Sequence, residues 1–172
     1  MKHLINTISI FAVLLLCSCG KNEEEALKEF KKEMESLEVV IQQVSAVDQE
    51  DVKAGIKAIN RLASKLEPIE TRGLPEDLKK AFEEARESWT EMGKYMSDAP
   101  FPLELAHDEE AMQTWAVAQV EKDPEFMAKF QASVEKWEKG GDEATDRAET
   151  AVLDLEVAFK KHKIDVDLSS LK

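Results

Sequence analysis

The chain has 172 residues, of which 36 are acidic and 23 are basic, so its formal net charge is −13 at pH 7. This charge repels nucleic acid and anionic lipid headgroups, which sets nucleic-acid binding aside. Glu and Lys interleaved on helix faces explain the acidity without a special function, and the length fits one domain with one core.

The first eighteen residues predict a signal peptide. Lys2 and His3 open a basic segment, and an apolar run from Leu4 to Leu16 follows it. This run is too short to cross a bilayer as a helix of ~20 residues. We therefore expect residues 1–18 to direct secretion and then to be removed.

The end of the apolar run reads Leu16-Cys17-Ser18-Cys19. It resembles the lipobox of bacterial lipoproteins, and the resemblance implies cleavage before Cys19 and lipidation of Cys19. Enterobacterial lipoproteins retained in the inner membrane carry Asp at the next position, whereas this chain has Gly20. That difference favours the outer membrane, with the protein facing the periplasm. Residues 19–25 would then be a lipidated stalk and residues 26–168 a helical-bundle domain.

Cleavage would leave the mature domain without a free thiol, because Cys17 leaves with the signal peptide and Cys19 is acylated. Disulfides, thiolate metal sites, cysteine nucleophiles and thioether-linked haem are then excluded. His107 and His162 are the histidines that remain, so a multi-histidine zinc site is excluded as well.

Beyond the stalk, apolar residues recur at spacings of three and four, which indicates helices that pack along one face. We expect a first helix over roughly 23–46 and a second that Asp48 caps and Pro68 ends. These two helices should form an antiparallel hairpin. A third helix should begin with Pro75 and end within 98–102.

From His107 onward the pattern is less regular. Asp108-Glu109-Glu110 is typical of a helix start and predicts a short fourth helix, and Asp123-Pro124-Glu125 predicts another N-terminus. Gly140-Gly141 predicts a break in the chain.

The last helix is expected from about Asp142 to His162. Ile164, Val166 and Leu168 then alternate with aspartates, as in an extended tail that packs on one side. No strand pairing, phosphate loop or internal repeat is indicated. The predicted fold is all-α: an up-and-down four-helix bundle with one or two extra helices inserted before the last helix.

Two residues of the core stripes could bind a metal, Met34 in the first helix and His162 near the end of the last. In an up-and-down bundle these positions lie at the same end and could face each other. Thioether and imidazole form a known axial pair for haem iron, one that favours electron transfer. Spacing alone also allows simpler roles, with Met34 as core filler and His162 interacting with the helix dipole.

The chain resembles the cytochrome b562 family of periplasmic four-helix bundles over about two-thirds of the mature sequence. The resemblance implies a non-covalent haem b with Met34 and His162 as its axial ligands, and a role in electron transfer. It rests on Met34-Glu35-Ser36-Leu37 with Val40-Ile41, Val52-Lys53, Pro75-Glu76 to Phe82, and Ala158-Phe159 with His162.

Two features depart from that family. The aromatic residue lies three positions before His162, and residues 98–125 form an insertion that could cover or fill a haem cleft. The related cytochrome c′ bundles carry Cys-x-x-Cys-His on this helix, but Ala158 and Lys161 stand where those cysteines would be, so covalent haem is excluded. The alternative of a family member that has lost its haem and filled the core with large side chains also stays open.

The alternative function is an envelope interaction or scaffolding lipoprotein that binds a partner through apolar residues between Phe101 and Val120. Glu104 and His107 have the spacing of a di-iron motif, but di-iron bundles need a second copy. No nucleophile and base pair points to an enzyme. A haem protein requires Met34 and His162 to face a cavity, whereas a binding module predicts a filled core and an apolar patch on the insertion.

Overall fold

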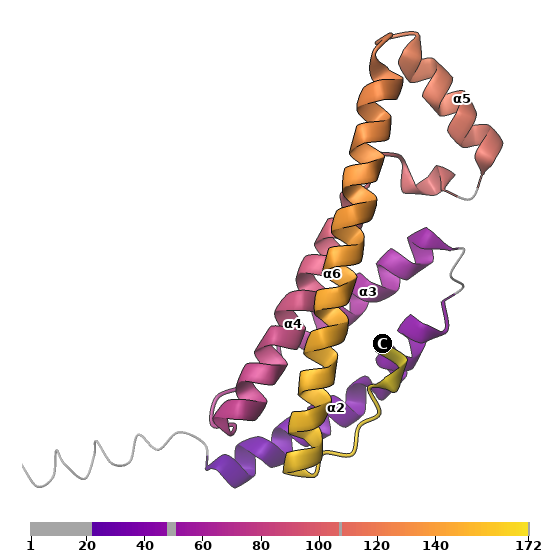
Figure 1. Ribbon diagram of the computed structural model, residues 1–172. Helices are drawn as coiled ribbons and strands as arrows, with labels where there is room; N and C mark the ends of the chain where they lie inside the picture. Colours follow the sequence, from indigo (N-terminus) through magenta and orange to yellow (C-terminus); the bar gives the residue numbers. More distant parts are fainter. Residues whose placement is uncertain (1–21, 48–50, 107, 172) are drawn as a thin grey trace, which may run out of the picture.

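A computed structural model describes residues 22–47, 51–106 and 108–171, and every regular element in those ranges is helical (Figure 1). The predicted all-α class is therefore confirmed for these ranges. The predicted signal peptide, Cys19, Asp48 and His107 lie outside them. No helix within the described ranges is both long and apolar enough to cross a membrane.

The first half of the chain forms three α-helices close to their predicted positions. α2 covers Glu23–Ser45, α3 covers Val52–Leu66 and α4 covers Glu76–Ser97. All three carry the apolar stripe that the sequence predicts, and the stripe faces the interior. Pro75 stands just before the first residue of α4, where the missing N–H of proline costs nothing.

Side-chain caps set the starts of α2 and α3. The Asn22 carboxamide oxygen accepts a hydrogen bond from the Glu24 N–H, so α2 begins inside the stretch predicted as a stalk. Asp51 caps α3 by accepting from the Ala54 N–H at 2.8 Å. Each cap satisfies a backbone donor that has no partner within the helix.

The second half of the chain has a short 3-10 helix, η1 (Leu103–Leu105), and then α5, which covers Glu109–Val120. α6 covers Phe126–His162, a single helix of 37 residues. A final 3-10 turn, η2, covers Ser169–Leu171.

The predicted break at Gly140-Gly141 is wrong, because α6 runs through both glycines. They lie where α4 packs closely against α6: a Cβ on Gly140 would collide with the Tyr95 ring. The Tyr95 hydroxyl donates to the Lys136 carbonyl at 2.9 Å, and the Trp137 indole donates to the Tyr95 carbonyl at 3.3 Å. The first glycine is thus needed for this contact between helices.

The molecule has two parts that share α6 (Figure 1). The body consists of α2, α3, α4, residues 141–162 of α6 and the tail 163–171. The arm consists of residues 98–139, which include η1, α5 and the first part of α6. In Figure 1 the arm extends beyond the body, at the opposite end from the start of α2.

The body has a closed apolar core to which all four of its helices contribute. Within it the Phe30 ring meets the rings of Phe82 and Phe159 edge-on, with centroid distances of 5.0 and 6.1 Å. Such edge-to-face pairs add roughly 0.5–1.5 kcal/mol each beyond the burial of their surface. Aromatic packing therefore joins α2, α4 and α6 in this part of the body.

The C-terminal tail packs as its alternating sequence predicts. Ile164, Val166 and Leu168 are buried, while Asp165 and Asp167 are exposed. η2 then lies against α2. The tail therefore covers part of the core that the helices leave open.

Candidate functional site

The two predicted haem ligands both lie in the body but have different surroundings. Met34 is in the core, with 1% of its surface exposed. His162 is the last residue of α6, and its imidazole Nε2 lies 3.1 Å from the Asp77 carboxylate. Lys161 approaches the same carboxylate, with its Nζ 2.6 Å from Oδ2. His162 is therefore held by the first turn of α4.

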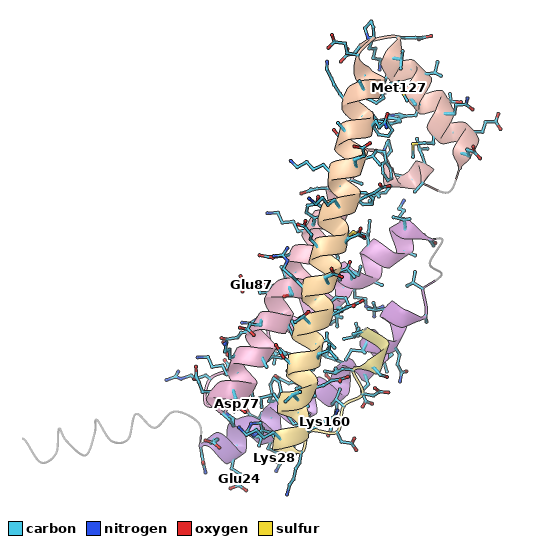
Figure 2. All side chains as sticks on the ribbon, in the orientation of Figure 1. Glu24, Lys28, Asp77, Glu87, Met127 and Lys160 are labelled. Atoms are coloured by element: carbon cyan, nitrogen blue, oxygen red, sulfur yellow. The ribbon has the colours of Figure 1, made fainter. Side chains whose placement is uncertain are left out.

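Asp77 is the electrostatic centre of this contact. The hydrogen bond from Lys161, together with that from His162, lowers the pKa of Asp77 to about 2. Asp77 also stands in the first turn of α4, where a negative charge interacts favourably with the helix dipole. In Figure 2 Asp77 lies at the foot of the body, near the end of α6. The three side chains join the start of α4 to the end of α6.

A haem between Met34 and His162 would have to displace packed aromatic rings. Phe30 lies one turn before Met34 and Phe159 one turn before His162, and their rings pack against each other. These rings lie between α2 and α6 beside the two candidate ligands. Among the described residues, no group of three or more His, Cys, Asp or Glu side chains could hold a metal ion. Haem binding stays a prediction.

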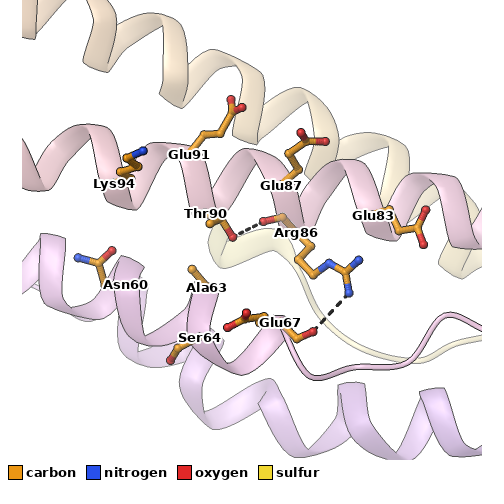
Figure 3. Close-up of a pocket in the computed structure, with 10 residues that line it drawn as sticks. All are labelled: Asn60, Ala63, Ser64, Glu67, Glu83, Arg86, Glu87, Thr90, Glu91 and Lys94. Atoms are coloured by element: carbon orange, nitrogen blue, oxygen red, sulfur yellow. Dashed lines mark hydrogen bonds between the residues drawn. The ribbon is translucent and has the colours of Figure 1, made fainter.

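A groove between α3 and α4 has a volume of about 740 Å³ (Figure 3). Several of its charged residues have structural roles. The Arg86 guanidinium donates to the carbonyls of Glu67 and Ile69 at 3.4 and 3.3 Å. Glu91 forms an ion pair with Arg147 at 2.9 Å. The Ser64 hydroxyl is also engaged, since it donates to a carbonyl of its own helix. This geometry indicates a polar surface between splayed helices and gives no nucleophile with an adjacent base.

The arm has an aromatic cluster of its own. The Trp115 ring of α5 meets the rings of Phe126 and Phe130 of α6, each at 5.5 Å. Phe126 and Phe130 stack on each other at 5.4 Å. Nearer the body, Phe101 meets Trp137 edge-on at 5.5 Å. These contacts hold α5 and the loop before it against α6.

The arm differs from the body because its apolar side chains are incompletely covered. From residue 94 through residue 140, no described residue is buried. Val117 of α5 is 55% exposed and Met127 of α6 is 49% exposed. The body also exposes Val39, Leu153 and Val157, so the difference lies in the absence of a core among the described residues of the arm. Met127 is labelled near the tip of the arm in Figure 2. Two helices alone cannot enclose a core, so the arm presents apolar and aromatic surface to solvent.

The sequence placed the candidate binding segment at 101–120, and the described residues of that segment all lie in the arm. The prediction from the sequence did not include Met127, because that residue lies in the next helix. It also missed the contact of Asp77 with His162, since 85 positions separate the two residues. A local signal did exist for α5, because residues 111–120 carry no charge in a chain with 34% charged residues.

Comparisons of this chain with protein-family models, with curated proteins and with solved structures find no match.

Proposed function

We propose that this chain is a lipid-anchored envelope protein that binds or scaffolds another protein through its arm. In this proposal the body is an up-and-down four-helix bundle that serves as a support. The observation that carries the proposal is the contrast between a closed body core and an arm without any buried residue among those described. A core is stabilised by excluding water, so apolar surface left exposed is better explained by binding than by folding.

The positions of the two ends agree with this role. Residue 22 begins the described chain at one end of the body, while the arm occupies the other end of the molecule (Figure 1). α6 alone spans roughly 55 Å at 1.5 Å per residue. Lipid on Cys19 would thus attach the protein near α2, and the arm would point away from that membrane. The proposed location is the outer membrane, with the arm in the periplasm.

A site-specific crosslinker tests the proposal in the cell that makes the protein. We would place a photoreactive residue at Met127 in the arm or, as a control, at Val39 in the body, which is 63% exposed. We expect a discrete adduct of one mass from Met127 and none of that mass from Val39. Identical adducts from both positions, or none from Met127, would contradict binding through the arm.

Haem-dependent electron transfer is the second candidate. It is supported by the burial of Met34 and by the contact of Phe30 with Phe159, which brings the start of α2 to the end of α6. The packed rings make it the weaker candidate, because the helices would have to separate to admit a macrocycle.

A further inference from the structure

The outer surface of α5 has a distinctive distribution of charge. Residues 111–120 are uncharged, whereas Glu109 and Glu110 precede them and Glu121 follows. Because α5 is apolar over most of its circumference, packing its Trp115 side on α6 leaves other apolar residues outside. Val117 is the clearest example, with 55% of its surface exposed.

One face of α5 combines exposed apolar surface with acidic residues at both ends. Glu110, Thr114, Val117 and Glu121 recur at intervals of four, three and four, so they follow one another along the same side of the helix. A shallow groove of about 480 Å³ lies beside this face and shares Glu110 and Thr114 with it. Its lining consists of Asp108, Glu110, Ala111, Thr114, Trp115 and Ala118.

We infer that this face of α5 and its groove form the docking site for a basic amphipathic helix of a partner protein. The inference rests on the proposed function and adds the chemistry of the partner. α5 has 12 residues, which corresponds to roughly 18 Å or about three turns. The partner segment should be of similar length, with an apolar stripe at its centre and Lys or Arg at both ends.

Charge decides between a basic partner and a second copy of this chain. Residues 98–139 contain ten acidic and four basic side chains. Two of the four lysines form ion pairs within the chain, Lys129 with Asp123 and Glu125, and Lys139 with Glu143. Two arms brought together would repel each other, whereas a helix with basic ends would meet opposite charge at both ends of α5.

The apolar part of the contact should supply affinity and the charges should supply selectivity. A partner helix lying over Thr114 would cover Val117 on one side and place a side chain in the groove on the other, where the small side chains of Ala111 and Ala118 allow close approach. The exposed carboxylates at the two ends would favour lysines and reject glutamates, an effect that weakens as salt concentration rises.

Binding of designed helical peptides tests the inference. The whole processed chain is held in nanodiscs of neutral lipid, and the signal from empty nanodiscs is subtracted. One peptide of roughly 16 residues has leucines on one face and lysines at both ends, and its counterpart has the same leucines with glutamates at the ends. Fluorescence anisotropy of each labelled peptide gives its Kd. We expect the lysine peptide to bind at least tenfold more tightly.

Matched variants locate the site. Replacing Glu109, Glu110 and Glu121 by Gln should weaken the binding of the lysine peptide roughly fivefold to tenfold. The same change at Glu33, Glu35 and Glu149 of the body should leave its Kd unchanged. Val117→Asn should weaken it roughly tenfold, and Val39→Asn should not. Both valines are exposed, so neither change requires the protein to refold its core.

Several results would overturn the inference. One is that the two peptides bind with equal Kd. Another is that the arm variants and the body variants lose affinity for the lysine peptide to the same degree. A third is that the chain self-associates and that Val117→Asn abolishes this self-association. If the Met127 crosslink persisted in any of these cases, the arm would still bind a partner and only the assigned chemistry would be wrong. Loss of that crosslink would instead remove the proposed function itself.

Discussion

The imidazole of His162 lies 3.1 Å from the carboxylate of Asp77, so the last residue of α6 is attached to the first turn of α4. The two residues are far apart in the chain but complete one charged cluster with Lys161. The residue that the sequence offered as an iron ligand thus has a structural partner.

The pH dependence of stability should reveal this cluster. The pKa of Asp77 is lowered from 3.8 to about 2 by its hydrogen bonds to Lys161 and His162. A carboxyl whose pKa is lower in the folded state contributes stability above its unfolded pKa and loses it as the pH falls through its folded pKa. Between pH 5 and pH 2, thermal unfolding of the native chain should therefore lose more stability than that of Asp77→Asn. The control Asp154→Asn removes an exposed carboxylate of α6 and should follow the native chain. Parallel curves for the native chain and Asp77→Asn would contradict the assignment.

Gly140→Ala should destabilise the protein even though alanine favours helices. The new Cβ would collide with the Tyr95 ring and disturb its hydrogen bond to Lys136. Overpacking of this kind costs about 1–3 kcal/mol, against a gain of about 1 kcal/mol in helix propensity. Denaturant unfolding measures the difference.

Gly55→Ala provides the matched control for that experiment. Nothing lies within 4 Å of a Cβ at Gly55, so this change within α3 should stabilise by about 0.5–1 kcal/mol. If Gly140→Ala stabilised the protein to the same degree, the close approach of Tyr95 to α6 would be refuted.

The amide hydrogens of α5 should exchange with solvent faster than those of α4. α4 contributes buried residues such as Phe82 and Trp89 to the core, whereas α5 has none. Local opening is easiest where little apolar surface is buried. Hydrogen exchange followed by mass spectrometry should show early labelling of residues 109–120. Equal protection of the two helices would mean that the arm is as firmly packed as the body.

Cys19→Ser should abolish lipidation. We expect the native chain to lose its signal peptide and gain the mass of a lipid anchor, and to sediment with the outer membrane. The variant should keep the signal peptide because the lipoprotein signal peptidase requires the modified cysteine. Mass spectrometry of the intact protein and membrane fractionation test this. A Cys17→Ser control should behave as the native chain does.

Absorption spectroscopy separates the two candidate functions. Protein purified from cells supplied with haem should have a featureless visible spectrum if the arm is the functional site. A Soret band with sharp α and β bands, lost in both Met34→Ala and His162→Ala, would instead establish a b-type cytochrome. Circular dichroism of each variant confirms that the helices remain.

Features that depend on local spacing were predictable from the sequence. The stripe through Phe30 and Met34 is buried as expected, and the alternation of Ile164, Val166 and Leu168 correctly indicated a tail packed on one side. The cap of α3 lay three residues from its predicted position. Both Asp48 and Asp51 precede the stripe, and periodicity alone does not choose between them.

Features that depend on distant contacts were not predictable. Glycine ends helices often enough that Gly140-Gly141 indicated a break. Here Gly140 lies inside α6, where the absence of a Cβ leaves room for the Tyr95 ring of α4. The surroundings of the candidate ligand pair were not predictable for a related reason. Spacing placed Met34 and His162 at the same end of the body, yet it carried no information about the Phe30 and Phe159 rings or about Asp77.

The continuity of α6 fixes the rotational phase of the arm. Each residue of an α-helix turns the chain by about 100° and advances it by 1.5 Å. One residue inserted near Gly140 would swing Phe126 and Phe130 about 100° around the helix axis relative to the contacts that α6 makes with α4. Trp115 would then lose its contacts with Phe126 and Phe130, or α5 would have to move around the helix axis with these two rings. The direction in which the groove opens is therefore encoded in the number of residues along one helix.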